Sequence, residues 1–571
     1  MTQHHPALTA GGHRGRFLPN IWDVLAFAIL FGLLAGVMHG GGETMAPLTD
    51  VVQTPISLDP RALPEYALRT LLRMLTALLA SLLFSLAYAT LAARSRRAEM
   101  VLIPLLDILQ SVPVLGFLSF TVAGFMGLFP GRVLGVELAA VFAIFTSQAW
   151  NMTFSFYQSL KSLPSELDEA ARSFRLTPWR RFWGLDVPFA VPGLVWNAMM
   201  SMSGGWFFVV AAEAISVGNT TISLPGIGSY VALAIEKRDL GAVGYALAAM
   251  LVVILACDQV MFRPLVAWAE RFHAEAAPDG SLPRSWALRA IRRSRLFALA
   301  FSPIGRLGRL RLGRLPRFQR LSGAWQSRWA DRAWLALLVF AGTYAALEAG
   351  SFVIAAVPPS EGLTVIGLGL LTMLRVVVLL ALASLLWVPL GVMIGLRPRL
   401  AMRLQPLAQF LAAVPANIVF PFAVVLIARF DLNPDIWLSP LMILGTQWYI
   451  LFNVIAGAAA FPRDLRDAAA NFRVGGWRWW RKVMLPGIMP YYVTGAITAG
   501  GGSWNAAIVA EVASWGSTTL TAHGLGAYIA QATVAGDKAR IMLGVAVMSL
   551  FVILFNRVLW RPLFDRANRF N

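Results

Sequence analysis

The sequence is poor in charged residues, cysteine and lysine. Only 13% of its 571 residues are charged, against about 25% in soluble domains. The single cysteine, Cys257, excludes a disulfide within the chain. None of the four lysines follows a glycine, so the chain lacks the Gly-Lys-Ser/Thr of a phosphate-binding loop. The six histidines show no metal-ligand spacing. We therefore expect no enzyme, no metal, no cofactor bound by this chain, and no ATP hydrolysis by it.

Hydrophobic residues make up 58% of the chain, which indicates a lipid environment. The formal charge of +19 would by itself suggest nucleic acid or an anionic surface as a partner. The position of the charge decides between them, because residues 263–332 hold 15 arginines against four acids and lie between two hydrophobic blocks. This pattern is typical of a cytoplasmic loop, so we expect the lipid bilayer as a partner and no nucleic acid. The segment fits a flexible linker and an amphipathic helix on anionic lipid equally well.

Apolar runs of roughly 20 residues, the length of one bilayer crossing, recur along the chain. They predict an all-α polytopic membrane protein with twelve transmembrane helices, arranged as two parallel six-helix modules. The run at residues 24–38 counts as an uncleaved first span, because only a poor cleavage site follows it. The predicted spans lie near residues 20–38, 68–92, 101–128, 133–155, 189–214 and 241–262, and near 333–357, 364–396, 404–429, 436–458, 489–512 and 539–560.

Arginine clusters set the predicted orientation. With the N-terminus inside, nearly all of them fall on the cytoplasmic side, so both termini are expected there. The predicted organisation is a cytoplasmic tail at residues 1–17, a first six-span module at 18–272, an arginine-rich cytoplasmic linker at 273–331 and a second six-span module at 332–571.

The two halves are copies of each other. ELDEAARSFRL, residues 166–176, returns as DLRDAAANFRV at residues 464–474, an offset of 298. The same offset relates Glu213 to Glu511 and GIGSYV to GLGAYI. Matches that keep the same offset at several places in the chain indicate an internal duplication rather than chance. An even number of crossings in each copy gives both copies the same orientation.

Each polar cassette predicts a short amphipathic helix. Apolar residues recur at helical spacing, acids crowd the first turn and arginines follow, which suits the helix dipole. Pro164 and Pro462 are well placed to begin the two helices. A solvated polar face would explain one such helix. Two matched helices on the same side, each after the fourth span of its half, instead suit docking to two copies of a soluble partner.

The stretch from Glu169 to Pro188, EAARSFRLTPWRRFWGLDVP, resembles the EAA loop of type I ABC importer permeases. The second copy matches with Asp467 in place of the leading acid. Arg175 and Arg473 stand where the family has glycine, which usually supplies positive φ there. This exchange leaves the form of the turn after the helix open, and both halves make it.

The resemblance implies a transport function without covalent chemistry in this chain. In such permeases the loop forms a coupling helix that sits in a groove of a separate ATPase subunit. The chain would therefore work in a bacterial cytoplasmic (inner) membrane with two ATPase subunits, which use ATP and Mg, and with a periplasmic or extracellular substrate-binding protein. The residues expected at the ATPase are Glu166, Asp168, Glu169, Ala170, Ala171, Phe174 and Arg175, and Asp464, Asp467, Ala468, Ala469, Phe472 and Arg473.

Two further motifs narrow the resemblance. AAEAI followed by PGIGSYV, and AEVAS followed by HGLGAYI, resemble the nitrate, sulfonate, taurine and bicarbonate branch of these permeases. That branch implies a small anion as the solute. Some of its members are similar to carriers of pyrimidine-like vitamin precursors, which remain an alternative solute class.

Polar residues within the spans are candidates for the translocation path. Arg73 and Arg375 either snorkel to the outer surface or make the path attractive to anions. Glu213 and Glu511 serve either as structural hydrogen-bonding groups or as a gate. The candidates are Arg73, Gln148, Asn197, Trp206, Glu213, Arg375, Gln447, Trp504, Asn505 and Glu511.

Small residues in the fifth span of each half let helices approach closely. We expect these glycines to pack helices rather than to contact solute. They are Gly204, Gly205, Gly500, Gly501 and Gly502.

A secondary transporter of the major facilitator type is the main alternative, since it also has twelve spans in two parallel halves with a long basic central loop. It would have no use for a paired cassette after the fourth span, and ARSRRAE at residues 93–99 lacks its glycine and aspartate pattern. A membrane scaffold that only anchors partners is a further alternative. Matched path candidates in both halves argue against it.

Overall fold

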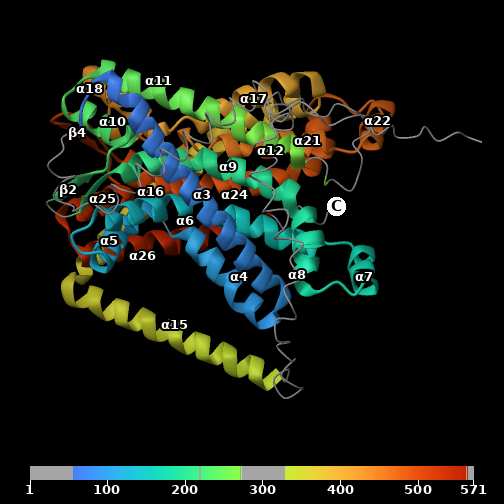
Figure 1. Ribbon diagram of the computed structural model, residues 1–571. Helices are drawn as coiled ribbons and strands as arrows, with labels where there is room; N and C mark the ends of the chain where they lie inside the picture. The colour runs from blue at the N-terminus through green and yellow to red at the C-terminus, as the bar shows by residue number, and fades with distance from the viewer. Residues whose placement is uncertain are drawn as a thin grey trace, which may run out of the picture.

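The computed structural model describes residues 56–112, 114–217, 220–269, 272, 328–560 and 562–563. These parts of the chain are mainly helical and repeat one succession of elements twice (Figure 1). The expected tail, the first span near residues 20–38 and nearly all of the basic linker lie outside the described residues.

Three long helices form the frame of the first half. α3 (Leu63–Arg94) packs along α6 (Val133–Lys161), and α6 packs along α9 (Val187–Glu213). Small buried residues on α3 and α6, such as Ala77 and Ala143, allow this close approach. The other elements are α4 (Arg96–Ser111), α5 (Val114–Leu128), α7 (Ser165–Ser173), α8 (Pro178–Arg181), the hairpin of β1 (Ala214–Val217) and β2 (Thr220–Ser223), α10 (Ile227–Glu236), α11 (Leu240–Cys257) and α12 (Arg263–Ala269).

The second half repeats this frame with α16 (Pro359–Gly395), α21 (Trp448–Ala459) and α24 (Leu485–Ala510). α15 (Arg328–Ala356) precedes them and lies along the outside of the bundle (Figure 1). The remaining elements are α17 (Pro398–Ala413), α18 (Ala416–Arg429), α19 (Pro434–Trp437), α20 (Leu441–Leu444), α22 (Arg463–Asn471), α23 (Gly476–Trp479), the hairpin of β3 (Val512–Trp515) and β4 (Thr518–Thr521), α25 (Leu525–Ala535) and α26 (Lys538–Phe555).

Seven helices in the described residues are long and apolar enough to cross a membrane, or nine when each of two bent pairs counts as one span. An all-α polytopic membrane protein is therefore confirmed, while the count of twelve stays a prediction. Two of the predicted spans are bent, since α17 and α18 meet at 73° and α19–α20 meets α21 at 45°. Pro415 explains the first break, because the residue before a proline avoids the helical region and Val414 has ψ 123°.

The third predicted span of the first half, at residues 101–128, is also divided, into α4 and α5. α5 packs against α24, α25 and α26 of the second half, and α18 packs against α9 and α11 of the first. One hydrophobic core accordingly joins Val122 of α5 to Met548 of α26. A second core joins Ile418 of α18 to Val209 of α9. α5 and α18, which are equivalent in the repeat, thus each pack against the other half.

The two halves present the same features at the same ends of the molecule. α7 and α22 project at one end, hereafter the coupling end, and the β1–β2 and β3–β4 hairpins lie at the opposite end, hereafter the hairpin end (Figure 1). This parallel arrangement agrees with the even number of crossings that the sequence predicts for each copy.

Candidate coupling helices and translocation path

α7 and α22 begin directly after Pro164 and Pro462, as the sequence predicts. They end in a left-handed residue, with φ 51° at Arg175 and φ 53° at Arg473. Beyond each helix the next amide donates back across the turn, from Leu176 to Ala171 at 3.1 Å in the first copy. The turn that glycine makes in the family is therefore made here by arginine, at a cost of about 1–2 kcal/mol per residue.

Each of these helices has one buried alanine and one exposed phenylalanine. Ala171 and Ala469 are 5% and 6% exposed, so they face the body of the protein. Phe174 and Phe472 are 79% and 82% exposed at the ends of the helices. The two helices thus expose a large apolar side chain at the same position of the repeat.

Ion pairs connect α7 to the long helices of its half. Asp168 on α7 pairs with Arg172 at 2.6 Å and with Arg181 at 2.5 Å. Arg181 also reaches Asp186 at 3.4 Å, and Arg94 at the end of α3 pairs with Asp186 at 2.5 Å. These ion pairs link α7 to the end of α3 and to the segment directly before α9.

The second half has an apolar connection at the equivalent place. Phe461, directly before the turn into α22, is 6% exposed. It lies so close to Gly487 of α24 that an added Cβ at this glycine would overlap its ring. Glycine at residue 487 therefore allows the segment before α22 to pack directly against α24.

Glu99 holds α4 and α6 together at the coupling end. Its carboxylate accepts hydrogen bonds from Lys161 at 2.8 Å and from Tyr157 at 2.5 Å. These two donors hold the pKa of Glu99 below its usual range. The group stays ionised at neutral pH and fixes the end of α6 from which the chain enters α7.

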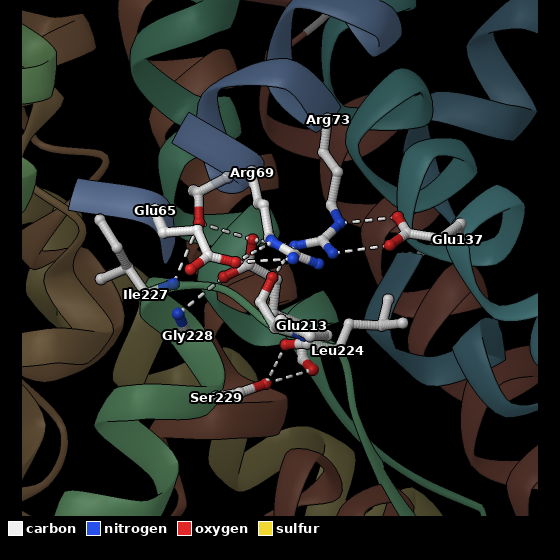
Figure 2. Close-up of polar contacts among 11 residues, drawn as sticks. Glu65, Arg69, Arg73, Glu137, Glu213, Leu224, Ile227, Gly228 and Ser229 are labelled. Atoms are coloured by element: carbon white, nitrogen blue, oxygen red, sulfur yellow. Dashed lines mark hydrogen bonds and ion pairs between the residues drawn. The ribbon is translucent and has the colours of Figure 1, made fainter. Parts of the chain in front are cut away.

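A buried arginine cluster lies near the hairpin end of the first half (Figure 2). Arg73 donates to Glu213 at 2.7 Å and makes a two-bond contact with Glu137 at 2.6 and 2.7 Å. Glu213 also accepts hydrogen bonds from the hydroxyl of Thr70 and the amide of Gly228, each at 2.7 Å. Arg73 is 6% and Glu213 0% exposed, while the side chain of Glu137 is 16% exposed. The cluster ties α3, α6, α9 and α10 together in a largely buried place.

The second half has an equivalent but more open cluster. Arg375 donates to Glu511 at 3.1 Å and to Asp435 at 2.9 Å, and Thr372 donates to Glu511 at 2.8 Å. Asp435 also contacts the ring of His523 at 3.0 Å. The side chains of Asp435 and His523 are 35% and 80% exposed. The four expected path residues of these clusters thus lie in ion pairs, and neither arginine snorkels.

A cavity of about 180 Å³ lies between the halves. Its walls come from α6 and α9 on one side and from α21 and α24 on the other, and no charged side chain is among the described residues that line it. Of the ten expected path residues, Asn505 is among them. Gly204, Gly501 and Gly502 also line it, although packing alone was expected of them.

The other expected path residues lie away from this cavity. The amide of Gln148 is buried and donates to the sulfur of Met74 at 3.0 Å. Trp206 and Trp504 are 2% and 1% exposed and belong to the cores. Asn197 donates to the carbonyl of Gly193 at 3.0 Å, and Gln447 accepts from Trp387 at 2.9 Å.

Several polar side chains of the cavity were missed from the sequence, among them Trp150, Asn151 and Tyr449. Trp150 and Asn151 come from α6, and Tyr449 comes from α21. They lie within three residues of Gln148 and Gln447, which the sequence analysis names as path candidates. The helical register turned the neighbours, rather than the two glutamines, toward the cavity.

The chain was compared with known protein families. The model of the binding-protein-dependent transport system inner membrane component matches residues 60–263 and 387–560, once in each half. The chain belongs to this family. It is a transport permease with two modules in one polypeptide, of the ABC importer type that the EAA loop indicates, and the major facilitator and scaffold alternatives are wrong.

Curated relatives cover one module each. The chain is 30% identical over 181 residues to the bicarbonate transport system permease protein CmpB of Synechococcus elongatus, covering 32% of this chain and 62% of the relative. It is 28% identical over 182 residues to the nitrate import permease protein NrtB of Leptolyngbya laminosa, covering 32% and 62%. It is 30% identical over 213 residues to the glycine betaine/proline betaine permease protein ProW of Salmonella typhimurium, covering 37% and 55%. The match spans less than two thirds of each relative's length.

Proposed function

We propose that this chain is the permease of an ATP-driven importer for a small anion, such as nitrate, a sulfonate, taurine or bicarbonate. α7 and α22 are the coupling helices, each held by one of two ATPase subunits that bind and use ATP and Mg. The coupling end then faces the cytoplasm, with both termini on that side, and the hairpin end faces a substrate-binding protein outside.

The observation that carries this proposal is the pair of exposed phenylalanines on matched helices. Phe174 and Phe472 are 79% and 82% exposed, and both helices project at the same end of the molecule (Figure 1). Two equal ATPase grooves would cover both rings and remove their apolar area from water. The acids Glu169 and Asp467 then lie on the helix surface toward basic groups of the ATPase.

Transport follows from relative motion of the two halves. ATP-driven closure of the ATPase subunits draws α7 and α22 together, and the connections of these helices to α9 and α24 carry the motion into the membrane. The cavity between the halves is then exposed alternately to the two sides of the membrane.

A second candidate solute is a betaine. The glycine betaine/proline betaine permease ProW is among the relatives, and the cavity is lined by the rings of Trp150, Phe207 and Phe208. Aromatic faces attract quaternary ammonium groups. A cavity without charged side chains among its described lining residues is compatible with an anion and with a betaine. Uptake measurements must decide between the two solutes.

The coupling role is tested by reversing charge on both helices. We expect Glu169→Lys combined with Asp467→Lys to abolish ATP-dependent uptake by the complete transporter in proteoliposomes, because like charges would face the ATPase grooves. Membrane insertion should be unchanged, as measured by the amount of chain in the membrane fraction.

Glu236→Lys is the matched control. Glu236 is exposed at the end of α10, at the hairpin end, so reversing its charge should leave coupling intact. Normal uptake by the double variant would contradict the coupling role of α7 and α22.

A further inference from the structure

The cavity between the halves contains hydrogen-bonding groups that the protein itself leaves unused. In the described part of the chain, the indole N–H of Trp150, the amide of Asn151 and the hydroxyl of Tyr449 make no hydrogen bond, although each side chain lines the cavity. The three side chains are half-buried, so the cavity offers their polar groups to a ligand or to water.

Other polar side chains of the cavity are already paired with the backbone. Ser203 donates to the carbonyl of Ala412 at 2.8 Å, and Thr498 donates to the carbonyl of Thr494 at 3.0 Å. Asn505 accepts from the amide of Val114 at 2.7 Å. These groups shape the wall. Among the described lining residues, Gln110 and Asn556 also make no side-chain hydrogen bond, so five polar side chains, including Trp150, Asn151 and Tyr449, remain available to a solute.

The unpaired groups come from opposite walls and are held in place. The ring of Trp150 on α6 packs edge-on against Phe84 and Phe145. The hydroxyl of Tyr449 on α21 lies against Gly204 of the first half, where an added Cβ would be 3.0 Å from the oxygen. A solute between these residues would therefore contact both halves at once.

We propose that Trp150, Asn151 and Tyr449 recognise the solute in transit and select a small oxyanion through uncharged donors. This inference rests on the proposed import function. Indole N–H and phenol O–H groups donate hydrogen bonds to anionic oxygens, and the Asn151 amide adds a further donor. Because no fixed positive charge lines the cavity, the anion is held weakly enough to leave on the other side.

The duplication makes this recognition one-sided. In the repeat, Phe207 and Phe208 of α9 correspond to Asn505 and Ala506 of α24, at the offset of 298. At these positions the first half therefore offers two aromatic rings, and the second half offers an amide and a methyl group. The solute meets two different walls, which two identical halves would not provide.

The test uses the complete transporter in proteoliposomes with labelled nitrate, bicarbonate, taurine and glycine betaine as probes. We expect uptake of at least one of the three anionic or sulfonate probes. For that probe, Trp150→Phe, Asn151→Leu and Tyr449→Phe should each raise the KM of uptake by about fivefold, the effect of losing one uncharged hydrogen bond, with the ATPase rate without solute unchanged.

Matched controls make the same chemical changes away from the cavity. Tyr245→Phe and Trp437→Phe alter side chains that are 56% and 51% exposed on the outside of the bundle, and both should leave the KM of uptake unchanged. Uptake of glycine betaine alone, or of none of the probes, would overturn the assigned solute class. An unchanged KM in all three cavity variants would overturn the site, whereas loss of coupling in the Glu169 and Asp467 variant would still support the proposed function.

Discussion

At the scale of single residues, the two halves use arginine in unexpected ways. Arg175 and Arg473 take the left-handed conformation that the family assigns to glycine. Arg73 and Arg375 lie among carboxylates near the hairpin end instead of reaching a surface or the cavity. A buried arginine of this kind is held by its partners, and its removal leaves a buried charge without compensation.

We predict that Arg73→Leu destabilises the protein by about 3–5 kcal/mol, because Glu213 and Glu137 would lose their partner in a buried place. Arg375→Leu should cost less, since Asp435 is 35% exposed and can be solvated. The measurement is the thermal unfolding midpoint of each variant in detergent. Arg429→Leu, at an exposed position, is the control, and equal midpoints for all three variants would contradict the role of the clusters.

At the scale of elements, the hairpin end contains a contact that crosses between the halves. The β3–β4 turn reaches α10 of the first half, where Gly516 donates its amide to the carbonyl of Ile235 at 2.8 Å. Arg238 donates to Ser517 of the same turn. Gly516 has φ 59°, and a side chain there would collide with Arg238. The turn therefore closes tightly against the other half, and the missing side chain of Gly516 leaves room for Arg238.

A disulfide across this contact should stop transport. A Cβ at residue 516 would lie 2.5 Å from Cγ of Arg238, which brings a cysteine pair at Arg238→Cys and Gly516→Cys within disulfide range. With Cys257→Ser to remove the native thiol, oxidation should abolish uptake and a reductant should restore it. Each single-cysteine variant serves as control. Full uptake by the oxidised pair would mean that the halves need not separate there.

At the scale of the whole molecule, the interface between the halves is made by exchanged helices. α5 packs in the core of the second half, and α18 packs in the core of the first. Gly116 shows how close this packing is, since an added Cβ would be 2.7 Å from Val545. Each half alone would expose apolar surface that its counterpart now buries.

The helix exchange predicts that the halves assemble without a covalent connection. Two polypeptides divided at residue 300, expressed together, should co-purify and support ATP-dependent uptake, because the buried contacts lie in α5 and α18. Either polypeptide expressed alone should be degraded or should aggregate. The measurement is affinity capture through a tag on one polypeptide, and failure of the two halves to co-purify would contradict the prediction.

The sequence alone predicted the membrane class, the duplication and the two short helices α7 and α22, because these depend on hydrophobic length and on local spacing. Pro164 and Pro462 mark helix starts through their own backbone restriction, and an apolar run of 20 residues needs no knowledge of its neighbours to be recognised. Pro415 was available as a signal for the break between α17 and α18, but the length of the apolar run concealed it.

Only the tertiary structure decided which polar side chains face the cavity and which face each other. In the sequence, Glu137 lies 64 residues after Arg73 and Glu213 lies 140 residues after it. A local sequence pattern therefore cannot predict their contact. On α6, Gln148 and Asn151 differ by three positions, yet the first is buried against Met74 and the second lines the cavity. This difference depends on how each helix is rotated about its axis. Packing against distant segments of the chain determines that rotation.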